Sequence, residues 1–342
     1  MKNKNLLRNY WRLFIALCGL SLWIWLRTKW ITLQKWIHTG QNIPSIHEEI
    51  SLTWTLFLSP NTSHEWVITI LKSAKYSISI WWYQITDKEF IHVLKQKADQ
   101  WITVRIILEK STYWWTSKEY NQFIKQIQNS AIQVKSDEHL WINFQHAKTI
   151  LIDNNSFLVS SANYSYWWFF HNREHWFYSH EPNHSKALST LFDNDWTEKK
   201  EQTPPLFDSL RICPFNCREQ LTQFIDSAKT WIDIQAQYLE DEQLINQLIT
   251  KKNWWVTIRV IVWKYQENTL PSTLQESVRI MNDPNVHAKS ILIDWSKLYL
   301  WSMNLSENAV EKNREIGIVT NDKYVIRQFL WQFDKDRQSI SP

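Results

Sequence analysis

The fold of this chain is indicated by the stretch His146-Ala147-Lys148-Thr149-Ile150-Leu151-Ile152-Asp153, which returns almost unchanged as His287-Ala288-Lys289-Ser290-Ile291-Leu292-Ile293-Asp294. Counted from each histidine, the two halves stay in register as far as Glu174 and Glu315, and 13 of the 29 aligned positions are identical. Polar residues persist at positions that a purely structural repeat would let change. The chain is therefore predicted to contain a tandem duplication that retains a functional site.

Around these stretches, apolar runs of strand length alternate with amphipathic runs of helix length. In the first half we expect strands near 56–58, 76–80, 104–108 and 131–134, and helices near 62–75, 86–100 and 117–129. The order restarts after Pro204-Pro205, with strands near 210–212, 232–236 and 256–262, and helices near 216–229 and 240–252. This alternation predicts an α/β fold with two repeats, residues 51–203 and 204–342.

The spacing within each motif has a direct physical meaning. Alternate residues of a strand share a face, so His146 and Lys148 should point the same way, as should the corresponding pair of the second half. If the two strands meet at a pseudo-twofold interface, two imidazoles and two ammonium groups come together. Asn163 and Asn304, also in register, can add amide donors. We expect a compact cationic pocket that binds a tetrahedral phosphate without a metal.

These motifs resemble those of the phospholipase D superfamily, which is marked by His-x-Lys-x4-Asp followed by Gly-Ser-x-Asn. The resemblance covers about residues 51–338 and implies two phospholipase D-like α/β sandwich repeats, one composite active site and no cofactor. The first copy departs from the pattern with Ser160 at the glycine position, and the second departs with Trp301.

The resemblance also implies a two-step reaction through a phosphohistidine. By this analogy His146 is the nucleophile, and His287 protonates the leaving alcohol and then activates water or an acceptor alcohol. The sequence alone does not distinguish the two histidines. Glu174 and Glu315 are expected to fix the imidazole tautomers. The phosphate oxygens are expected to be bound by Lys148, Lys289, Asn163 and Asn304. The motif aspartates, Asp153 and Asp294, are expected to be structural and to anchor the strand and its turn.

Three functions are compatible with the motifs. The first is a phospholipase D or a phosphatidyltransferase such as a cardiolipin synthase, acting on phospholipids at a membrane. The second is an endonuclease of the same superfamily, which would use identical chemistry on DNA; a net charge of +4 is too small to indicate an extended nucleic-acid groove. The third is a non-catalytic membrane-bound scaffold, which the intact histidines and lysines of both motifs disfavour.

Some other features are open to more than one interpretation. Cys213 and Cys217 could form a disulfide or remain as buried thiols. The spacing of His171, His175, His180 and His184 could bind a metal, but a surface cluster is favoured because no further ligands complete a site. The aromatic run over 166–170 could contact acyl chains or bases, or form core or pocket wall.

The chain has 24 Trp and only 3 Gly, whereas glycine normally supplies about 7% of residues. Five tryptophans precede strands, occupy a probable hairpin turn or hold the glycine position of the motif: Trp101, Trp254, Trp255, Trp295 and Trp301. Such positions favour glycine, which adopts positive φ and permits close backbone approach. We interpret the composition as the result of a genetic code in which TGA specifies glycine; a genuinely tryptophan-rich protein is the alternative.

The N-terminal 50 residues are predicted to be a membrane anchor and linker. Basic residues flank an uncharged apolar run from Leu13 to Leu26. Its 14 residues are fewer than the roughly 20 that span a bilayer, but the basic start suits an uncleaved signal anchor, because no cleavage site is evident. A buried N-terminal helix is the alternative. The expected location is the membrane, with the side undetermined.

This interpretation predicts how the protein partitions. Full-length protein should sediment with the membrane fraction, whereas a truncated chain that begins near residue 45 should be soluble, because it lacks the apolar run. Centrifugation after cell lysis and immunoblotting would measure both. Full-length protein that stays in the supernatant without detergent would contradict the anchor.

Overall fold

The computed structural model describes residues 54–340, apart from 62, 111–116, 200–204, 206, 216 and 264–269. The segment expected to be a membrane anchor, residues 1–50, lies outside the described residues. Within the described part of the chain, no helix combines the length and the apolar character needed to cross a bilayer.

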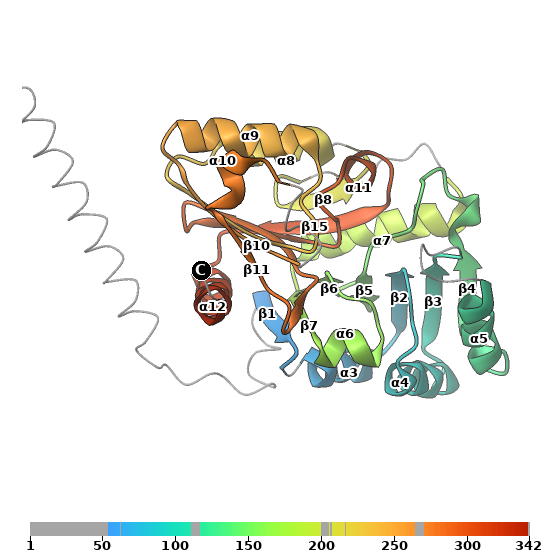
Figure 1. The fold of residues 1–342 in the computed structure, drawn as a ribbon. Helices are drawn as coiled ribbons and strands as arrows, with labels where there is room; N and C mark the ends of the chain where they lie inside the picture. The colour runs from blue at the N-terminus through green and yellow to red at the C-terminus, as the bar shows by residue number, and fades with distance from the viewer. Residues whose placement is uncertain are drawn as a thin grey trace, which may run out of the picture. The chain divides into compact units, whose positions relative to one another are not determined.

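The first repeat is a mixed sheet with helices packed on it (Figure 1). The strands lie in the order β1-β7-β6-β5-β2-β3-β4. In this order β2, β3 and β4 are parallel, and the other neighbouring pairs are antiparallel. Its elements are β1 (Trp54–Ser59), α3 (Ser63–Ser73), β2 (Ser77–Trp82), α4 (Lys88–Asp99), β3 (Thr103–Leu108), α5 (Ser117–Ile127), β4 (Gln133–Ser136), η1 (Asp137–His139), β5 (Thr149–Ile152), β6 (Ser156–Ser160), α6 (Tyr166–Phe170), β7 (Asn172–Ser179) and α7 (Pro182–Thr197).

The second repeat has the same topology. Its sheet order, β8-β15-β14-β13-β9-β10-β11, matches that of the first repeat strand for strand. The additional short strand β12 pairs instead with β7 of the first sheet. The elements are β8 (Leu210–Cys213), α8 (Cys217–Asp226), β9 (Trp231–Ala236), α9 (Glu242–Asn253), β10 (Thr257–Val262), α10 (Ser272–Gln275), β11 (Val278–Ile280), β12 (Asn285–Val286), β13 (Lys289–Ile293), β14 (Lys297–Trp301), α11 (Glu307–Glu311), β15 (Glu315–Thr320) and α12 (Lys323–Ser339).

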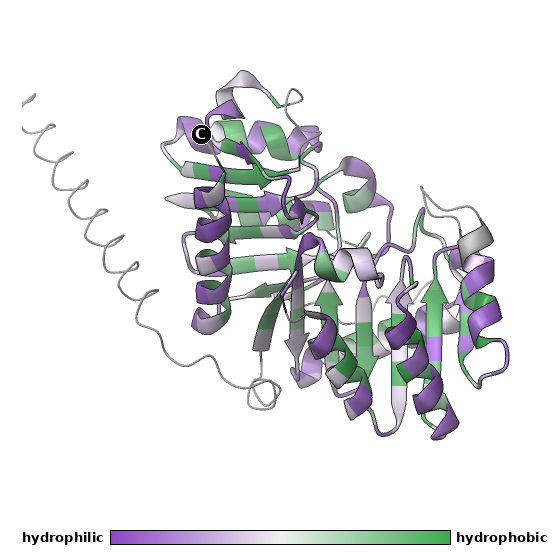
Figure 2. Cartoon of the chain, turned by 60° about the horizontal axis from the view of Figure 1, so that its bottom comes forward, coloured by the Kyte–Doolittle hydropathy of each residue, from purple (hydrophilic) through white to green (hydrophobic). Residues whose placement is uncertain are grey.

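The expected strands and helices are all present within a few residues, and local sequence explains where they begin. Central strands such as β5 and β13 are buried throughout and consist mainly of branched apolar residues. Figure 2 shows hydrophobic segments along both sheets and mixed faces on the helices. Helices α4 and α9 start at equivalent caps, where Asp87 and Asp241 accept hydrogen bonds from the amides of Phe90 and Leu244.

Two long helices join the repeats through buried ion pairs. The carboxylate of Asp195 in α7 binds the guanidinium of Arg314 in the second repeat, with Oδ1 and Nη2 2.8 Å apart. The carboxylate of Asp336 in α12 binds Arg173 of the first repeat in the same way, with Oδ2 and Nε 2.8 Å apart. Each fork-shaped guanidinium is held by two oxygens. The repeats therefore interlock.

The structure resolves two alternatives left open by the sequence. Cys213 and Cys217 form a disulfide, and the equivalent residues of the first repeat, Ser59 and Ser63, share a hydrogen bond of 2.6 Å. The expected surface cluster of histidines is wrong for His175 and His184, which are both buried because β7 and α7 pack into the interior. No group of three or more metal-ligating side chains is found in the described ranges.

Tryptophan occupies two helix ends that suit glycine. After α4 the backbone turns left-handed at Trp101, with φ of 65°, and after α9 at Trp255, with φ of 66°. In both places the next residue's amide bonds back to the helix, from Ile102 to Lys97 and from Val256 to Lys251, which is the hydrogen-bond pattern of a glycine-terminated helix. Trp101 and Trp255 are 96% and 93% exposed, so no packing explains the indoles.

The other three tryptophans behave differently from one another. Trp295 has φ of 52° and follows Asp294 at 48° in the turn from β13 to β14, an arrangement typical of Asp-Gly hairpins. Trp254 has φ of −93°, so its backbone does not require glycine. Trp301 lies in the core of the second repeat opposite Gly317.

The codon interpretation predicts TGA at Trp101, Trp255 and Trp295, and at Trp301 in the motif. Mass spectrometry of the native protein should then find peptides lighter by an indole side chain at each site. TGG codons at these positions would refute the interpretation.

The backbone gives an independent test in protein made with tryptophan. Trp255→Gly should raise the free energy of unfolding by about 1 kcal/mol, because a side chain in the left-handed region costs about 1–2 kcal/mol. Trp254→Gly is the matched control and should bring no gain, since its φ is negative. Urea unfolding of the two variants measures the difference.

Candidate active site

The two motif segments lie against each other's repeats. The amide of His146, just before β5, donates to the carbonyl of Arg314, and the amide of His287, between β12 and β13, donates to the carbonyl of Arg173; both bonds are 3.1 Å. Strand β12 continues this contact by pairing in parallel with the start of β7. The two histidines are therefore brought to the boundary between the sheets, as the sequence predicted.

Each imidazole is bound by a carboxylate from the opposite repeat. Nδ1 of His146 lies 2.7 Å from Oε1 of Glu315 in β15, and Nδ1 of His287 lies 2.8 Å from Oε1 of Glu174 in β7. A carboxylate at Nδ1 favours the tautomer that leaves Nε2 with its lone pair.

The glutamates are themselves held in place. The hydroxyl groups of Ser161 and Ser302 donate to Glu174 and Glu315 respectively. The side-chain amides of Asn172 and Asn313 approach the same carboxylates at 3.4 and 3.5 Å. These serines and asparagines were assigned no role from the sequence, although their identity in both repeats was the signal that could have revealed one.

The motif lysines are buried beside the histidines. Nζ of Lys148 donates to the carbonyl of His146 at 2.7 Å, and Nζ of Lys289 donates to the carbonyl of His287 at 2.8 Å. Lys289 also lies 3.1 Å from Nδ1 of His287. The Oδ1 atoms of Asn163 and Asn304 are buried and have no hydrogen-bond partner among the described residues.

Burial controls the ionisation of this cluster. It lowers the pKa of His146 to about 4, although Glu315 opposes the shift, and it lowers the pKa of Lys148 to about 7 and of Lys289 to about 8. Burial and the charge of Lys289 also lower the pKa of His287. Both imidazoles are therefore neutral at pH 7 before an anion binds.

The two glutamates differ. Burial raises the pKa of Glu174 to about 7. At Glu315 burial acts in the same direction, but the neighbouring His146 and Lys148 outweigh it and lower the pKa. At neutral pH Glu174 therefore keeps a proton more readily than Glu315.

The motif aspartates lie apart from this cluster, at the turns after β5 and β13. The carboxylate of Asp153 accepts hydrogen bonds from the amides of Lys75, Tyr76 and Ser77. Asp294 accepts the equivalent bonds from the amides of Lys229, Thr230 and Trp231. Their contacts are those of an anchor between the hairpin and the start of the neighbouring strand.

Aromatic side chains flank the histidines. The ring of Tyr83 lies 4.8 Å from that of His146, and the ring of Trp168 in α6 lies 4.1 Å from that of His287. Tyr83 was not among the sequence-predicted site residues, because its equivalent in the second repeat is Gln237 and no pattern marks it. Trp168 belongs to the aromatic run, which the sequence could not assign.

Paired imidazoles with buried ammonium groups have the chemistry that phosphoryl transfer requires. A family described as cardiolipin synthase, PLD-like domain, matches residues 67–196 and 221–337. The chain therefore belongs to the phospholipase D superfamily. No curated protein sequence is significantly similar to it.

Solved structures share the fold at low sequence identity. Polyphosphate kinase from Porphyromonas gingivalis superimposes with a TM-score of 0.69 at 16% identity, over 86% of this chain and 52% of the kinase, so the chain spans about half the length of that protein. Phosphatidylserine synthase from Haemophilus influenzae Rd KW20 has a TM-score of 0.61 at 13% identity, over 85% of this chain and 88% of the synthase. At these identities the similarity demonstrates the fold only.

The lowered pKa of His146 gives a prediction for titration. The ring should stay neutral from pH 7 down to about pH 4. In the unfolded chain histidine has a pKa of about 6.5. The contribution of the buried neutral ring to the free energy of unfolding is therefore complete above pH 6.5 and is lost as the pH falls towards 4. Glu315→Gln should lower the pKa of His146 further, because Glu315 raises it. NMR titration of the Cε1 proton measures both, and a midpoint at or above 6.5 would contradict the prediction.

Proposed function

We propose that the protein is a metal-independent phosphodiesterase or phosphatidyltransferase that acts on phospholipids through a phosphohistidine. The observation that carries this proposal is the paired arrangement in which each motif histidine is bound at Nδ1 by a glutamate of the other repeat. This arrangement leaves the two Nε2 atoms to act as nucleophile and general acid, beside two buried ammonium groups that can bind a phosphodiester. Together these groups could exchange one alcohol of the diester for another.

In the first step, Nε2 of His146 forms a bond to phosphorus while the bond from phosphorus to the head-group oxygen breaks. His287 gives its proton to that oxygen. In the second step, water or an acceptor alcohol attacks phosphorus and gives its proton to His287, and the bond from phosphorus to His146 breaks. Lys148, Lys289, Asn163 and Asn304 bind the non-bridging oxygens, so the chain's own cations take the charge that a metal would otherwise neutralise.

The ionisation of the glutamates supports this division of roles. A lowered pKa keeps Glu315 ionised, so it holds the Nδ1 proton of a neutral, nucleophilic His146. The raised pKa of Glu174 keeps a proton close to His287, and the negative charge of a bound phosphodiester favours its transfer onto the ring. His287 is then ready to act as the general acid.

The choice of a phospholipid substrate is supported by the matched family, whose description names cardiolipin synthase. The phosphatidylserine synthase also matches over nearly its whole length. An endonuclease that acts on DNA is the second candidate, because the same chemistry cleaves any phosphodiester.

The substrate and the roles can be tested together. Purified protein should release head group or exchange it in phosphatidylglycerol or phosphatidylcholine, and should leave plasmid DNA intact. His146→Ala and His287→Ala should each lose roughly 10²-fold or more of the lipid activity, whereas His92→Ala, on the exposed face of α4, should lose none. EDTA should have no effect. Cleavage of DNA alone would refute the lipid assignment.

A substrate with a good leaving group separates the two histidines. Nitrophenolate leaves without protonation, so His287→Ala should release one nitrophenolate from bis(p-nitrophenyl) phosphate as a burst of one equivalent and retain the p-nitrophenyl phosphoryl group on Nε2 of His146. His146→Ala should show no burst. The opposite result would reverse the roles.

A further inference from the structure

The two repeats differ in the short helix beside the active site. Helix α6 follows Ser165 and ends just before Asn172, and α11 occupies the equivalent place between Ser306 and Asn313. Helix α6 presents Tyr166 and Phe170 to solvent, with 64% and 37% of their surface exposed. The equivalent residues of α11 are Glu307 and Glu311, both exposed. The fold therefore does not require aromatic residues at this position.

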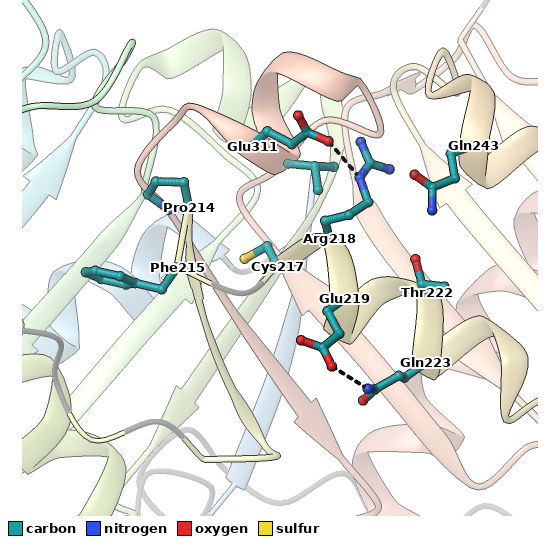
Figure 3. Close-up of a pocket in the computed structure, with 10 residues that line it drawn as sticks. Pro214, Phe215, Cys217, Arg218, Glu219, Thr222, Gln223, Gln243 and Glu311 are labelled. Carbon is teal, nitrogen blue, oxygen red and sulfur yellow. Dashed lines mark hydrogen bonds and ion pairs between the residues drawn. The ribbon is translucent and has the colours of Figure 1, made fainter.

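The contacts of the two helices differ accordingly. Phe170 lies against His64, with ring centroids 5.4 Å apart. At the equivalent place in the second repeat, Glu311 accepts a hydrogen bond of 3.0 Å from Arg218, which also binds Asp241. Figure 3 shows this ion pair at a surface hollow whose lining also includes Glu219, Gln223 and Gln243. The volume of the hollow is about 480 Å³. The surface around α6 is thus aromatic, and the surface around α11 is polar.

The aromatic helix is close to the reacting atoms. Trp168 of α6 contacts the ring of His287, and the residues that follow α6 lead directly into Asn172, which pairs with Asn285 two residues before His287. Helix α6 therefore borders the place where a phosphate at this histidine would be bound. Tyr166 and Phe170 are aromatic whichever way the tryptophan codons are translated.

We infer that α6 is the surface by which the enzyme contacts the acyl region of a phospholipid bilayer, while α11 faces water. The inference rests on the proposed phospholipid function. Exposed apolar side chains contribute most to the free energy of binding when the partner removes them from water. A tyrosine beside a phenylalanine suits the boundary between head groups and acyl chains. The glutamates of α11 could not enter that boundary without losing their hydration.

The experiment compares one lipid in two physical states. The full-length variant Tyr166→Ser/Phe170→Ser should lose about tenfold or more in turnover of phosphatidylglycerol vesicles, and should retain wild-type turnover of monomeric dibutyroyl phosphatidylglycerol. Glu307→Ser, at the position equivalent to Tyr166, is the matched control and should change neither. Equal effects on both substrates, or no effect, would overturn the inference.

Hydrogen exchange gives a second readout on the wild-type protein. Amides of α6 should gain protection on phosphatidylglycerol vesicles, and those of α11 should not. Protection of α6 by a single-stranded oligonucleotide instead of vesicles would show that the rings stack on bases and would overturn the inference. If wild-type protein turns over neither form of the lipid, the proposed function itself fails; if it turns over both and the double variant is unaffected, only the role of α6 fails.

Discussion

The contact between each motif histidine and the glutamate of the opposite repeat is the interaction on which the site depends. It is a hydrogen bond at His146 and a contact of 2.8 Å between Nδ1 and Oε1 at His287. It requires the two sheets to meet with β7 and β15 beside the motif segments, and Arg173 and Arg314 enforce this placement. Each arginine immediately precedes a glutamate, offers its carbonyl to the opposite histidine amide and is itself bound by an aspartate from α12 or α7. Because the arginines are buried, loss of one aspartate would leave an unpaired charge in the interior.

The burial of the ionisable groups in this cluster changes their protonation. Two lysines, two histidines and two glutamates share one enclosed region, and burial shifts most of them towards neutrality. Under the proposed function, a phosphodiester that entered would supply the negative charge needed to return protons to the cationic groups. The donors are already oriented by the backbone, so little reorganisation accompanies this change.

Much of this arrangement could be predicted from the sequence, because strand alternation and the repeated motif are local signals. The positions of the central strands and the meeting of His146 with His287 follow from them. The pairing of each histidine with the other repeat's glutamate does not, since both glutamates have the same spacing from their motifs. The ion pairs made by Asp195 and Asp336 could not be predicted either, because no pattern in α7 or α12 indicates that these helices contact the opposite repeat. The burial of Trp301 in the core of the second repeat could not be predicted, because the motif indicates its sequence position and not the face of β14 on which it lies.

The exchange of α7 and α12 bears on how such a chain could have arisen. A single half would expose an arginine, a histidine and a glutamate whose partners lie in the other half, yet two identical halves could satisfy one another around a twofold axis. A homodimeric ancestor would thus have had the same complementary contacts, but the formation of its dimer would have depended on protein concentration. Fusion into one chain makes the association of the two halves intramolecular. It also allows the halves to diverge: the first repeat has a hydrogen bond between Ser59 and Ser63 where the second has the disulfide between Cys213 and Cys217.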